Sequence, residues 1–263
     1  MRIARFTTGD EPKYAIVDGE PGNEELIVLS GDPMYIAGKP TGERLPLNAD
    51  NVRLLAPVIP RSKAVCLGKN YEAHAKEIPS RGPAAEVPIL FLKPNTTVIG
   101  PDDPIVLPPY SQDVQVEAEL AIVIGRLCKD VSPESAEDYI YGFTCANDVT
   151  ARDLQRLEDQ WFRAKAFDTS LPLGPWIETE LAHDDVEVSS RINGKPVQTG
   201  HSSDMLVDVM NAVAMVSEIV TLLPGDVILT GTPSGVTALH HGDVVEIDIE
   251  GIGTLRNPVI RRD

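Results

Sequence analysis

The alternation of apolar and polar residues predicts a chain built mainly of short strands. Apolar runs four to eight residues long are separated by turns rich in Gly, Pro and Asp, a pattern typical of β-strands. The run that ends at Asp148 closes just before a predicted helix. We expect strands at 14–17, 26–29, 64–67, 89–92, 114–124, 143–148, 227–230 and 244–249.

A few segments instead carry helical signals. Residues 71–77 have helical composition and run into Pro79 and Pro83, which end a helix. Residues 150–163 begin with Thr150 and Asp153 at capping-box spacing. Between them and the last helix, Asn193 and Gly194 predict a tight hairpin turn. Residues 202–222 predict a long amphipathic helix with an apolar stripe of Leu206, Val209, Val213, Val216 and Val220.

Strands that outnumber helices predict a mixed β-rich α+β fold, a β roll or barrel with helices packed outside. Residues 1–58 predict a small N-terminal β domain. A crossing segment at 51–60, which contains Pro57 and Pro60, leads into a larger domain over 59–263.

Composition narrows the classes of function. The chain has 263 residues and a formal net charge of −17, so its surface repels phosphate backbones and anionic lipids. We therefore expect neither nucleic-acid nor membrane binding. No apolar run approaches the roughly 18 residues of a membrane helix. The N-terminus lacks the apolar stretch of a signal peptide, and three widely spaced cysteines suit a reducing cytosol.

The strand at 114–124 carries the most informative polar residues. Side chains on a strand alternate between its faces, so Glu117 and Glu119 project together from the face opposite Val116 and Ala118. Asp148 ends a second strand. Three carboxylates with room for waters predict a Mg²⁺ or Mn²⁺ site with open positions. The alternatives are a half-exposed strand with two surface glutamates and an aspartate that caps a helix.

Three further features could carry chemistry. His74 and Glu77 lie three residues apart on one helical face, where the carboxylate could orient the imidazole as a general base. A surface histidine beside a glutamate is the commoner arrangement. Lys165 lies among small and apolar residues. The alternative is a surface lysine whose stem covers apolar neighbours while its charge reaches solvent. Thr232 lies in the Gly-rich loop 229–235, whose amides could bind a carboxylate.

Together these residues resemble the fumarylacetoacetate hydrolase family. The similarity covers about residues 60 to 260, and residues 1–58 resemble the small N-terminal domain of many bacterial members. The similar blocks, in family order, are 68–77 (GKNYEAHAKE), 91–94 (FLKP), 116–125 (VEAELAIVIG), 147–155 (NDVTARDLQ), 165–169 (KAFDT), 224–228 (PGDVI) and 230–236 (TGTPSGV).

The resemblance implies a β-rich fold of the family type, usually in a homodimer. It implies that Mg²⁺ or Mn²⁺ is held at Glu117, Glu119 and Asp148. It also implies a His74–Glu77 dyad on a lid helix that orders when substrate binds. The remaining positions implied for the site are an active-site lysine and three substrate-facing residues: Lys165, Arg152, Gln155 and Thr232.

One departure concerns the pocket. The sequence has Ser170-Leu171 before Pro172, where family members often have Phe-Cys. This difference affects the expected shape of the pocket and not the metal ligands.

The activity implied by the resemblance is metal-dependent cleavage of carbon–carbon bonds in acylpyruvate-type 2-oxo acids, with oxaloacetate decarboxylation included. The substrate would be a small 2-oxo dicarboxylate or an acylpyruvate. The alternative within the family is isomerisation of 2-hydroxyhepta-2,4-diene-1,7-dioate in aromatic catabolism. The alternative outside enzymes is a β-rich protein that binds a metal and a small anion.

Overall fold

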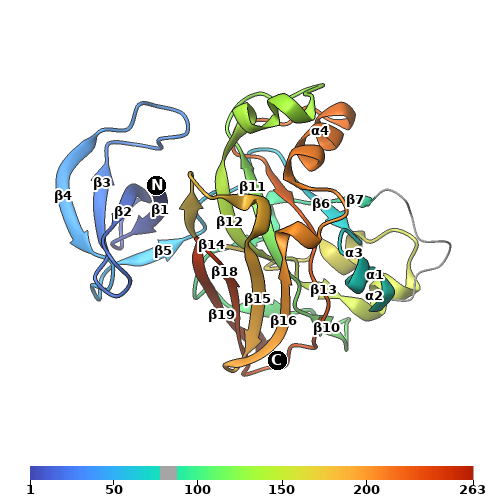
Figure 1. Cartoon of the computed structure of the whole chain (residues 1–263). Coiled ribbons are helices and arrows are strands. Elements are labelled where there is room, and N and C mark those ends of the chain that lie inside the picture. Colours follow the sequence, from blue (N-terminus) through green and yellow to red (C-terminus); the bar gives the residue numbers. More distant parts are fainter. Residues whose placement is uncertain (78–87, 263) are drawn as a thin grey trace.

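A large β-sheet organises the computed structural model, which describes residues 1–77 and 88–262 (Figure 1). Within those residues the sheet has twelve strands. They are β1 (Arg2–Thr7), β2 (Lys13–Asp18), β3 (Glu25–Leu29), β4 (Pro40–Pro46), β5 (Arg53–Leu55), β6 (Ala64–Gly68), β7 (Ile89–Lys93), β8 (Val98–Ile99), β11 (Ala118–Ile124), β12 (Ile140–Asn147), β14 (Leu171–Glu178) and β17 (Val227–Leu229).

β11 is paired on both edges and buried on both faces. The strand order runs β4-β3-β2-β1-β14-β12-β11-β17-β6-β7, with β5 beside β1 and β8 beside β14. β11 is thus an interior strand, antiparallel to both β12 and β17. Its side chains enter two hydrophobic clusters, with Leu120 and Ile122 in the larger one and Ala121 and Val123 in the smaller.

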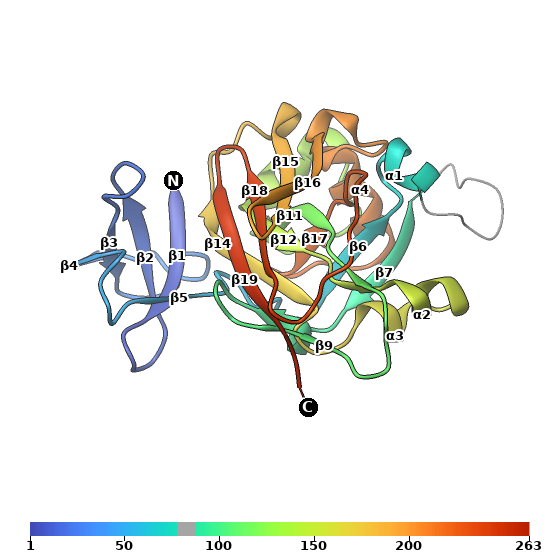
Figure 2. The ribbon, with the colours of Figure 1, turned by 90° about the horizontal axis from the view of Figure 1, so that it is seen from below.

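A second sheet packs against the first and encloses the larger cluster. Its five strands in the described chain are β9 (Ile105–Leu107), β15 (Glu187–Ile192), β16 (Lys195–His201), β18 (Val244–Ile249) and β19 (Gly253–Arg261). β15, β18 and β19 contact β11, β12 and β14 across the core (Figure 2). The expected β-rich roll is confirmed.

The helices lie outside the sheets. They are α1 (Glu72–Glu77), α2 (Arg152–Leu157), α3 (Phe162–Lys165) and α4 (Val209–Ile219). α1, α2 and α3 gather on the side away from the N-terminal strands, and α4 covers another edge (Figure 1). No helix in the described chain is long and apolar enough to cross a membrane.

The N-terminal strands β1–β5 form a unit at one end of the molecule (Figure 1). β1 pairs with β14 through Arg2 opposite Glu178 and Ile3 opposite Ile177. The sheet therefore continues from this unit into the rest of the protein. The domain boundary expected at residue 58 stays a prediction.

The helix expected at 150–163 is wrong in extent. Thr150 and Ala151 form β13 (Thr150–Ala151), which pairs with β10 (Val114–Gln115), so the chain is extended where the helix was expected to start. The Thr150 hydroxyl donates to the carbonyl oxygen of Asp148 at 2.8 Å and caps no helix. Asp153 accepts a 2.6 Å bond from the Ser111 hydroxyl instead of closing a capping box. Two short helices, α2 and α3, follow.

The amphipathic helix is shorter than the expected 202–222. Leu206 donates its backbone N–H to the carbonyl of Asn70, and Val207 donates to the Asn70 side chain, so this stretch is tied to another loop. The Asp208 side chain then caps α4 by accepting from the backbone of Asn211 at 2.9 Å. Leu206, placed on the stripe, is 58% exposed.

The single strand expected at 114–124 is interrupted. β10 ends at Gln115 and β11 starts at Ala118, which leaves Val116 and Glu117 between them. The hairpin expected at Asn193 and Gly194 is confirmed. Both residues have positive φ, 52° and 74°, which a type I′ turn requires.

Candidate active site

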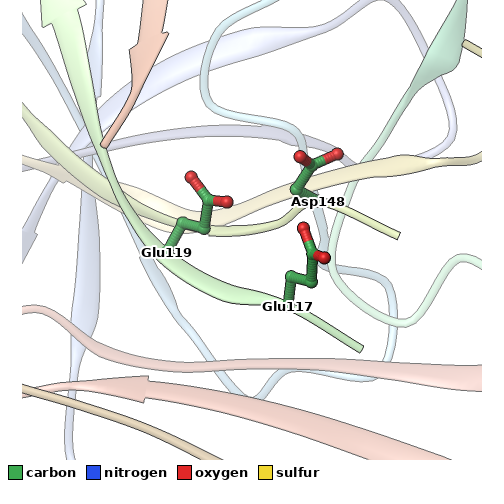
Figure 3. Close-up of side chains that lie close together, drawn as sticks. All are labelled: Glu117, Glu119 and Asp148. Atoms are coloured by element: carbon green, nitrogen blue, oxygen red, sulfur yellow. The ribbon is translucent and has the colours of Figure 1, made fainter. Parts of the chain in front are cut away.

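Strand register brings the three predicted carboxylates together. Ala118 pairs with Asn147 across β11 and β12, so the residues just outside this pair, Glu117 and Asp148, are also neighbours. The backbone N–H of Asp148 donates to the Glu117 carbonyl at 2.9 Å, and Glu117 donates its own N–H to the Asn147 side chain at 3.1 Å. Figure 3 shows the side chains of Glu117, Glu119 and Asp148 turned toward a common space.

The geometry of this cluster fits one divalent cation. Each of the three residues offers an oxygen, and these oxygens all lie within 4.8 Å of one another. An ion with oxygen ligands at about 2.0–2.2 Å spans roughly 4 Å between opposite ligands. The spacing of the cluster is of the same order as that span. The residues are 3%, 2% and 1% exposed, so little water reaches their charges.

The electrostatics also fit a cation. Burial, with the neighbouring Asp148 and Glu117, raises the pKa of Glu119 well above its ordinary value of 4.5. Its carboxyl accepts a 2.7 Å bond from the backbone N–H of Gly231. Oδ1 of Asp148 is buried and forms an ion pair with Nζ of Lys93 at 2.9 Å. A hard cation beside these oxygens would favour the ionised form of Glu119.

Lys165 projects from the end of α3 into this cluster. Its Nζ lies 2.6 Å from Oε2 of Glu117 and 2.6 Å from Oδ2 of Asp148. Burial alone lowers the pKa of Lys165, but the two carboxylates outweigh it and the pKa is raised. The ring of Phe91 lies 4.9 Å from the ammonium nitrogen.

Arg152 also contacts the carboxylate cluster, through Glu117. It is fully buried, forms an ion pair with Glu117, and donates to the side chains of Gln115 and Gln155. Burial raises the pKa of Glu117, but Lys165 and Arg152 outweigh it and the net shift is downward. Arg152 thus fixes Glu117. Its partner Gln155 lines the cavity, whereas Arg152 itself does not.

His74 and Glu77 form the expected pair on α1. Nδ1 of His74 is 3.3 Å from Oε2 of Glu77. Glu77 in turn accepts from the backbone N–H of Gly235 at 3.2 Å. His74 is 5% exposed, and burial lowers its pKa below 6.5, against the opposing effect of Glu117. The imidazole is therefore neutral at pH 7 and able to accept a proton.

These residues face a cavity of about 300 Å³. One wall is apolar, with Phe91 and Trp161 in a T-shaped contact at 5.5 Å. Gly68 is required beneath it, because a Cβ there would lie 2.8 Å from the Trp161 ring. The predicted residues that line the cavity are His74, Glu117, Glu119, Asp148, Gln155, Lys165 and Thr232.

Lys69 also lines the cavity and was not predicted from the sequence. Its backbone has φ of 66°, in the left-handed region that is uncommon for lysine. Partial burial lowers its pKa. Among the residues that the structure describes, no carboxylate forms an ion pair with it, so its charge is available to a ligand.

Two buried supports were also missed. Lys93 is fully buried and donates to the Ser170 carbonyl at 2.9 Å, to the Ser170 hydroxyl at 3.0 Å and to the carbonyl of Lys165. The sequence signal that could have found Lys93 is a lysine directly after the apolar strand at 89–92. Gln198 is 1% exposed and donates to the hydroxyl of Thr232. Ser170, the noted departure from the family pattern, is thus a partner of Lys93.

The expected lid spans residues 71 to about 87. Its first part is α1, which carries His74 and Glu77. Residues 78–87 lie outside the described residues, so lid movement stays a prediction.

Comparison with known proteins identifies the chain. Residues 63–260 match the family model described as fumarylacetoacetate (FAA) hydrolase C-terminal. The chain belongs to the fumarylacetoacetate hydrolase family. Residues 1–57 match a second model, Rv2993c-like, N-terminal.

Relatives within the fumarylacetoacetate hydrolase family carry several activities in their names. The crystal structure of 5-carboxymethyl-2-hydroxymuconate delta-isomerase from Mycobacterium smegmatis is 45% identical, covers 100% of both chains and gives a TM-score of 0.89. Human mitochondrial oxaloacetate tautomerase FAHD2A is 41% identical over 86% of this chain and 76% of its own length. Maleylpyruvate hydrolase from Sphingobium sp. SYK-6, solved with manganese(II) and pyruvate, is 29% identical with a TM-score of 0.81 and full coverage of both chains.

Proposed function

We propose that this protein is a Mg²⁺- or Mn²⁺-dependent enzyme that cleaves carbon–carbon bonds in small 2-oxo acids of the acylpyruvate type, with oxaloacetate decarboxylation included. One observation carries the proposal. Three buried carboxylates suited to one cation open onto the same cavity as a buried lysine and a neutral, carboxylate-bound histidine. The manganese and pyruvate in the related maleylpyruvate hydrolase support it.

Glu117, Glu119 and Asp148 would hold the ion. When bound, it supplies an electrophile that polarises the 2-oxo group of the substrate and stabilises enolate charge. Lys165, held between Glu117 and Asp148, adds a donor for a developing negative charge at the same place. Gln155 and Thr232 line the cavity and would contact the substrate.

His74 supplies the base. With its proton on Nδ1, His74 donates a hydrogen bond to Glu77, which leaves the lone pair on Nε2 free. In hydrolysis, Nε2 takes a proton from water as the water attacks the distal carbonyl. The bond to the pyruvyl carbon then breaks and its electrons stay on the pyruvate enolate. In decarboxylation the same enolate forms by loss of CO₂, without attack by water.

Isomerisation or tautomerisation is the second candidate. The names of two relatives, the Mycobacterium smegmatis delta-isomerase and the human oxaloacetate tautomerase, favour it. It uses the same polarised 2-oxo group but needs only proton transfer, for which His74 is suited. A non-catalytic anion-binding protein has no need of a neutral, buried histidine bound to Glu77 beside the three carboxylates.

A substrate panel tests the proposal. Purified protein with Mg²⁺ or Mn²⁺ is assayed on acetylpyruvate, fumarylpyruvate, oxaloacetate and the heptadienedioate, with EDTA as the metal-free control. We expect metal-dependent cleavage of at least one of the first three. Turnover of the heptadienedioate alone would favour the isomerase, and no turnover of any would reject both. The homodimer and the cytosolic location expected from the sequence stay predictions.

A further inference from the structure

We infer that Gln198 is a positioning residue that makes the Thr232 hydroxyl a hydrogen-bond donor toward the cavity. The hydrogen that faces the cavity then favours an acceptor there, such as a carboxylate or carbonyl oxygen of the substrate. The orientation follows from the hydrogen bonds alone, and only the naming of the ligand as a 2-oxo acid rests on the proposed function.

The amide of Gln198 has one possible orientation. Gln198 lies on β16, and its Oε1 is 3.0 Å from the backbone nitrogen of Ala118. A backbone N–H can only donate, so the atom facing it must be the amide oxygen. The same oxygen accepts from the Ser190 hydroxyl at 2.9 Å. The amide nitrogen therefore faces the opposite way.

That nitrogen has two acceptors, one for each of its hydrogens. Nε2 of Gln198 lies 2.8 Å from the Pro233 carbonyl oxygen and 2.8 Å from Oγ1 of Thr232. A carbonyl can only accept, and Nε2 has no lone pair to offer the hydroxyl. Thr232 must therefore accept from Gln198. Its own hydrogen points elsewhere.

The hydrogen of Thr232 is available to a ligand. Thr232 is 2% exposed and lines the cavity, and in the described chain its hydroxyl has no acceptor. A buried donor without a partner is costly, so a ligand that supplies an acceptor gains the full bond. A ligand that presents only an N–H at this point would leave the Thr232 hydrogen without an acceptor.

Gln198 also connects two parts of the site. Ala118, whose N–H it accepts, lies between Glu117 and Glu119 at the start of β11. The loop that holds Thr232 supplies the Gly231 N–H to Glu119. The buried side chain of Gln198 thus fixes the Thr232 hydroxyl relative to the carboxylate cluster.

Gln198→Glu is the informative variant because it keeps the shape and replaces Nε2, which donates to both Thr232 and Pro233, with an acceptor oxygen. A carboxylate accepts on both oxygens, so the bond from Ala118 survives while Thr232 must now donate to residue 198. Thr232→Val removes the hydroxyl at nearly constant volume. Thr199→Val is the matched control, since that exposed hydroxyl on the same strand donates only to the carbonyl of Gln198.

The orientation is tested directly by neutron diffraction from crystals exchanged into D₂O. We expect the deuterium of Thr232 to lie off the line to Gln198 and on the cavity side. A deuterium between Thr232 and Gln198 would overturn the inference, whatever reaction the protein catalyses.

The role is tested by a double-mutant cycle on oxalate binding, measured by calorimetry with saturating Mg²⁺. We expect Gln198→Glu and Thr232→Val each to weaken binding roughly 10- to 150-fold, the range of a bond to a charged group. Thr199→Val should bind as wild type and Thr232→Ser should restore affinity. In the Thr232→Val background, Gln198→Glu should add much less than it does alone.

The outcomes separate the inference from the proposed function. If wild type binds no oxalate, the proposed function fails, and the neutron map still decides the orientation. Equal effects of Gln198→Glu with and without the Thr232 hydroxyl would overturn the positioning role. The positioning role would also be overturned if, across the variants, oxalate affinity falls in proportion to the melting temperature measured without ligand.

Discussion

The ammonium nitrogen of Lys165 lies 2.6 Å from a carboxylate oxygen of Glu117, and both side chains are almost completely buried. This ion pair holds positive charge in the same space where the three carboxylates fit a divalent ion. Lys165 and a cation therefore compete for the same oxygens.

Lys165→Met should strengthen metal binding while it removes turnover. Without the ammonium group, the carboxylates lose a competing ion pair and the incoming ion meets less repulsion. We expect Mn²⁺ to bind roughly tenfold more tightly or better, as calorimetry would measure. The exposed Lys195→Met is the control. Weaker Mn²⁺ binding in Lys165→Met would show that the lysine supports the ion site instead.

Glu119→Gln should remove stabilisation by Mg²⁺. In wild type, a ligand at about 100 times its Kd adds roughly 2.7 kcal/mol to the free energy of unfolding. Differential scanning fluorimetry with and without Mg²⁺ measures the shift, with the exposed Glu187→Gln as control. A full Mg²⁺ shift in Glu119→Gln would contradict its role as a ligand.

The same variant should change how the metal-free protein responds to pH. The pKa of Glu119 is raised in the folded state, mainly by burial, so the folded protein holds this proton more tightly than the unfolded chain. Its contribution is complete below pH 4.5 and is lost as pH rises through the raised pKa. Glu119→Gln should lack this decline and melt at a higher temperature on the alkaline side.

Glu77→Gln should shift the pH dependence of activity. Burial lowers the pKa of His74 below 6.5, and the bond to Glu77 raises it. We expect the acid limb of kcat/KM to lie below pH 6.5 in wild type, since the base is lost only when His74 is protonated. Replacing the carboxylate should move that limb to still lower pH. A shift toward higher pH would contradict this account of the pair.

His74→Ala should separate the two cleavage reactions. Hydrolysis needs an activated water, whereas decarboxylation needs chiefly a stabilised enolate. General-base catalysis is typically worth about 10²–10⁴-fold, so acylpyruvate hydrolysis should fall by much more than oxaloacetate decarboxylation. Asp148→Ala should lower both alike. Equal losses in a folded His74→Ala that still binds Mn²⁺ would mean a role common to both reactions.

Lys69→Met should discriminate between substrates by charge. Lys69 offers the cavity a cation with no ion-pair partner among the described residues, so we expect it to bind the second carboxylate of a dicarboxylate. Losing a bond to a charged group costs about 1.5–3 kcal/mol, so kcat/KM for fumarylpyruvate should fall roughly 10- to 150-fold. Acetylpyruvate, which lacks that carboxylate, should change little, and Lys69→Arg should recover fumarylpyruvate. Equal losses on both substrates would reject this role.

The sequence alone predicted a β-rich chain and the residues that carry the carboxylates, although it missed the strands β1, β14 and β19. Period-two alternation predicted Glu117 and Glu119 on one face. The two carboxylates do lie together, although Glu117 comes just before β11 and is held by its backbone bonds to Asn147 and Asp148. The hairpin at Asn193 and Gly194 was a local feature, since its turn needs two residues that tolerate positive φ. The strand that ends at Asp148 added the third carboxylate, and the family resemblance added Lys165 and Thr232 to the same site.

Helix limits were decided by tertiary contacts. Thr150 has the sequence of a helix cap, but pairing of β13 with β10 holds it extended and turns its hydroxyl to Asp148. Asn70, distant in sequence, holds Leu206 and Val207 out of the expected helix. Local propensity is worth a few tenths of a kcal/mol to about 1 kcal/mol per residue, which such contacts outweigh.

The direction of the hydrogen bonds in the site was also decided by the folded structure. Nothing in the sequence around Gln198 marks it as part of the site, because its partners Ala118 and Thr232 come from other strands and loops. Lys93 likewise acquires its role only when Ser170 is brought beside it. A hydrogen-bond direction depends on what each partner can donate, and the partners of a buried amide are known only once the chain has folded.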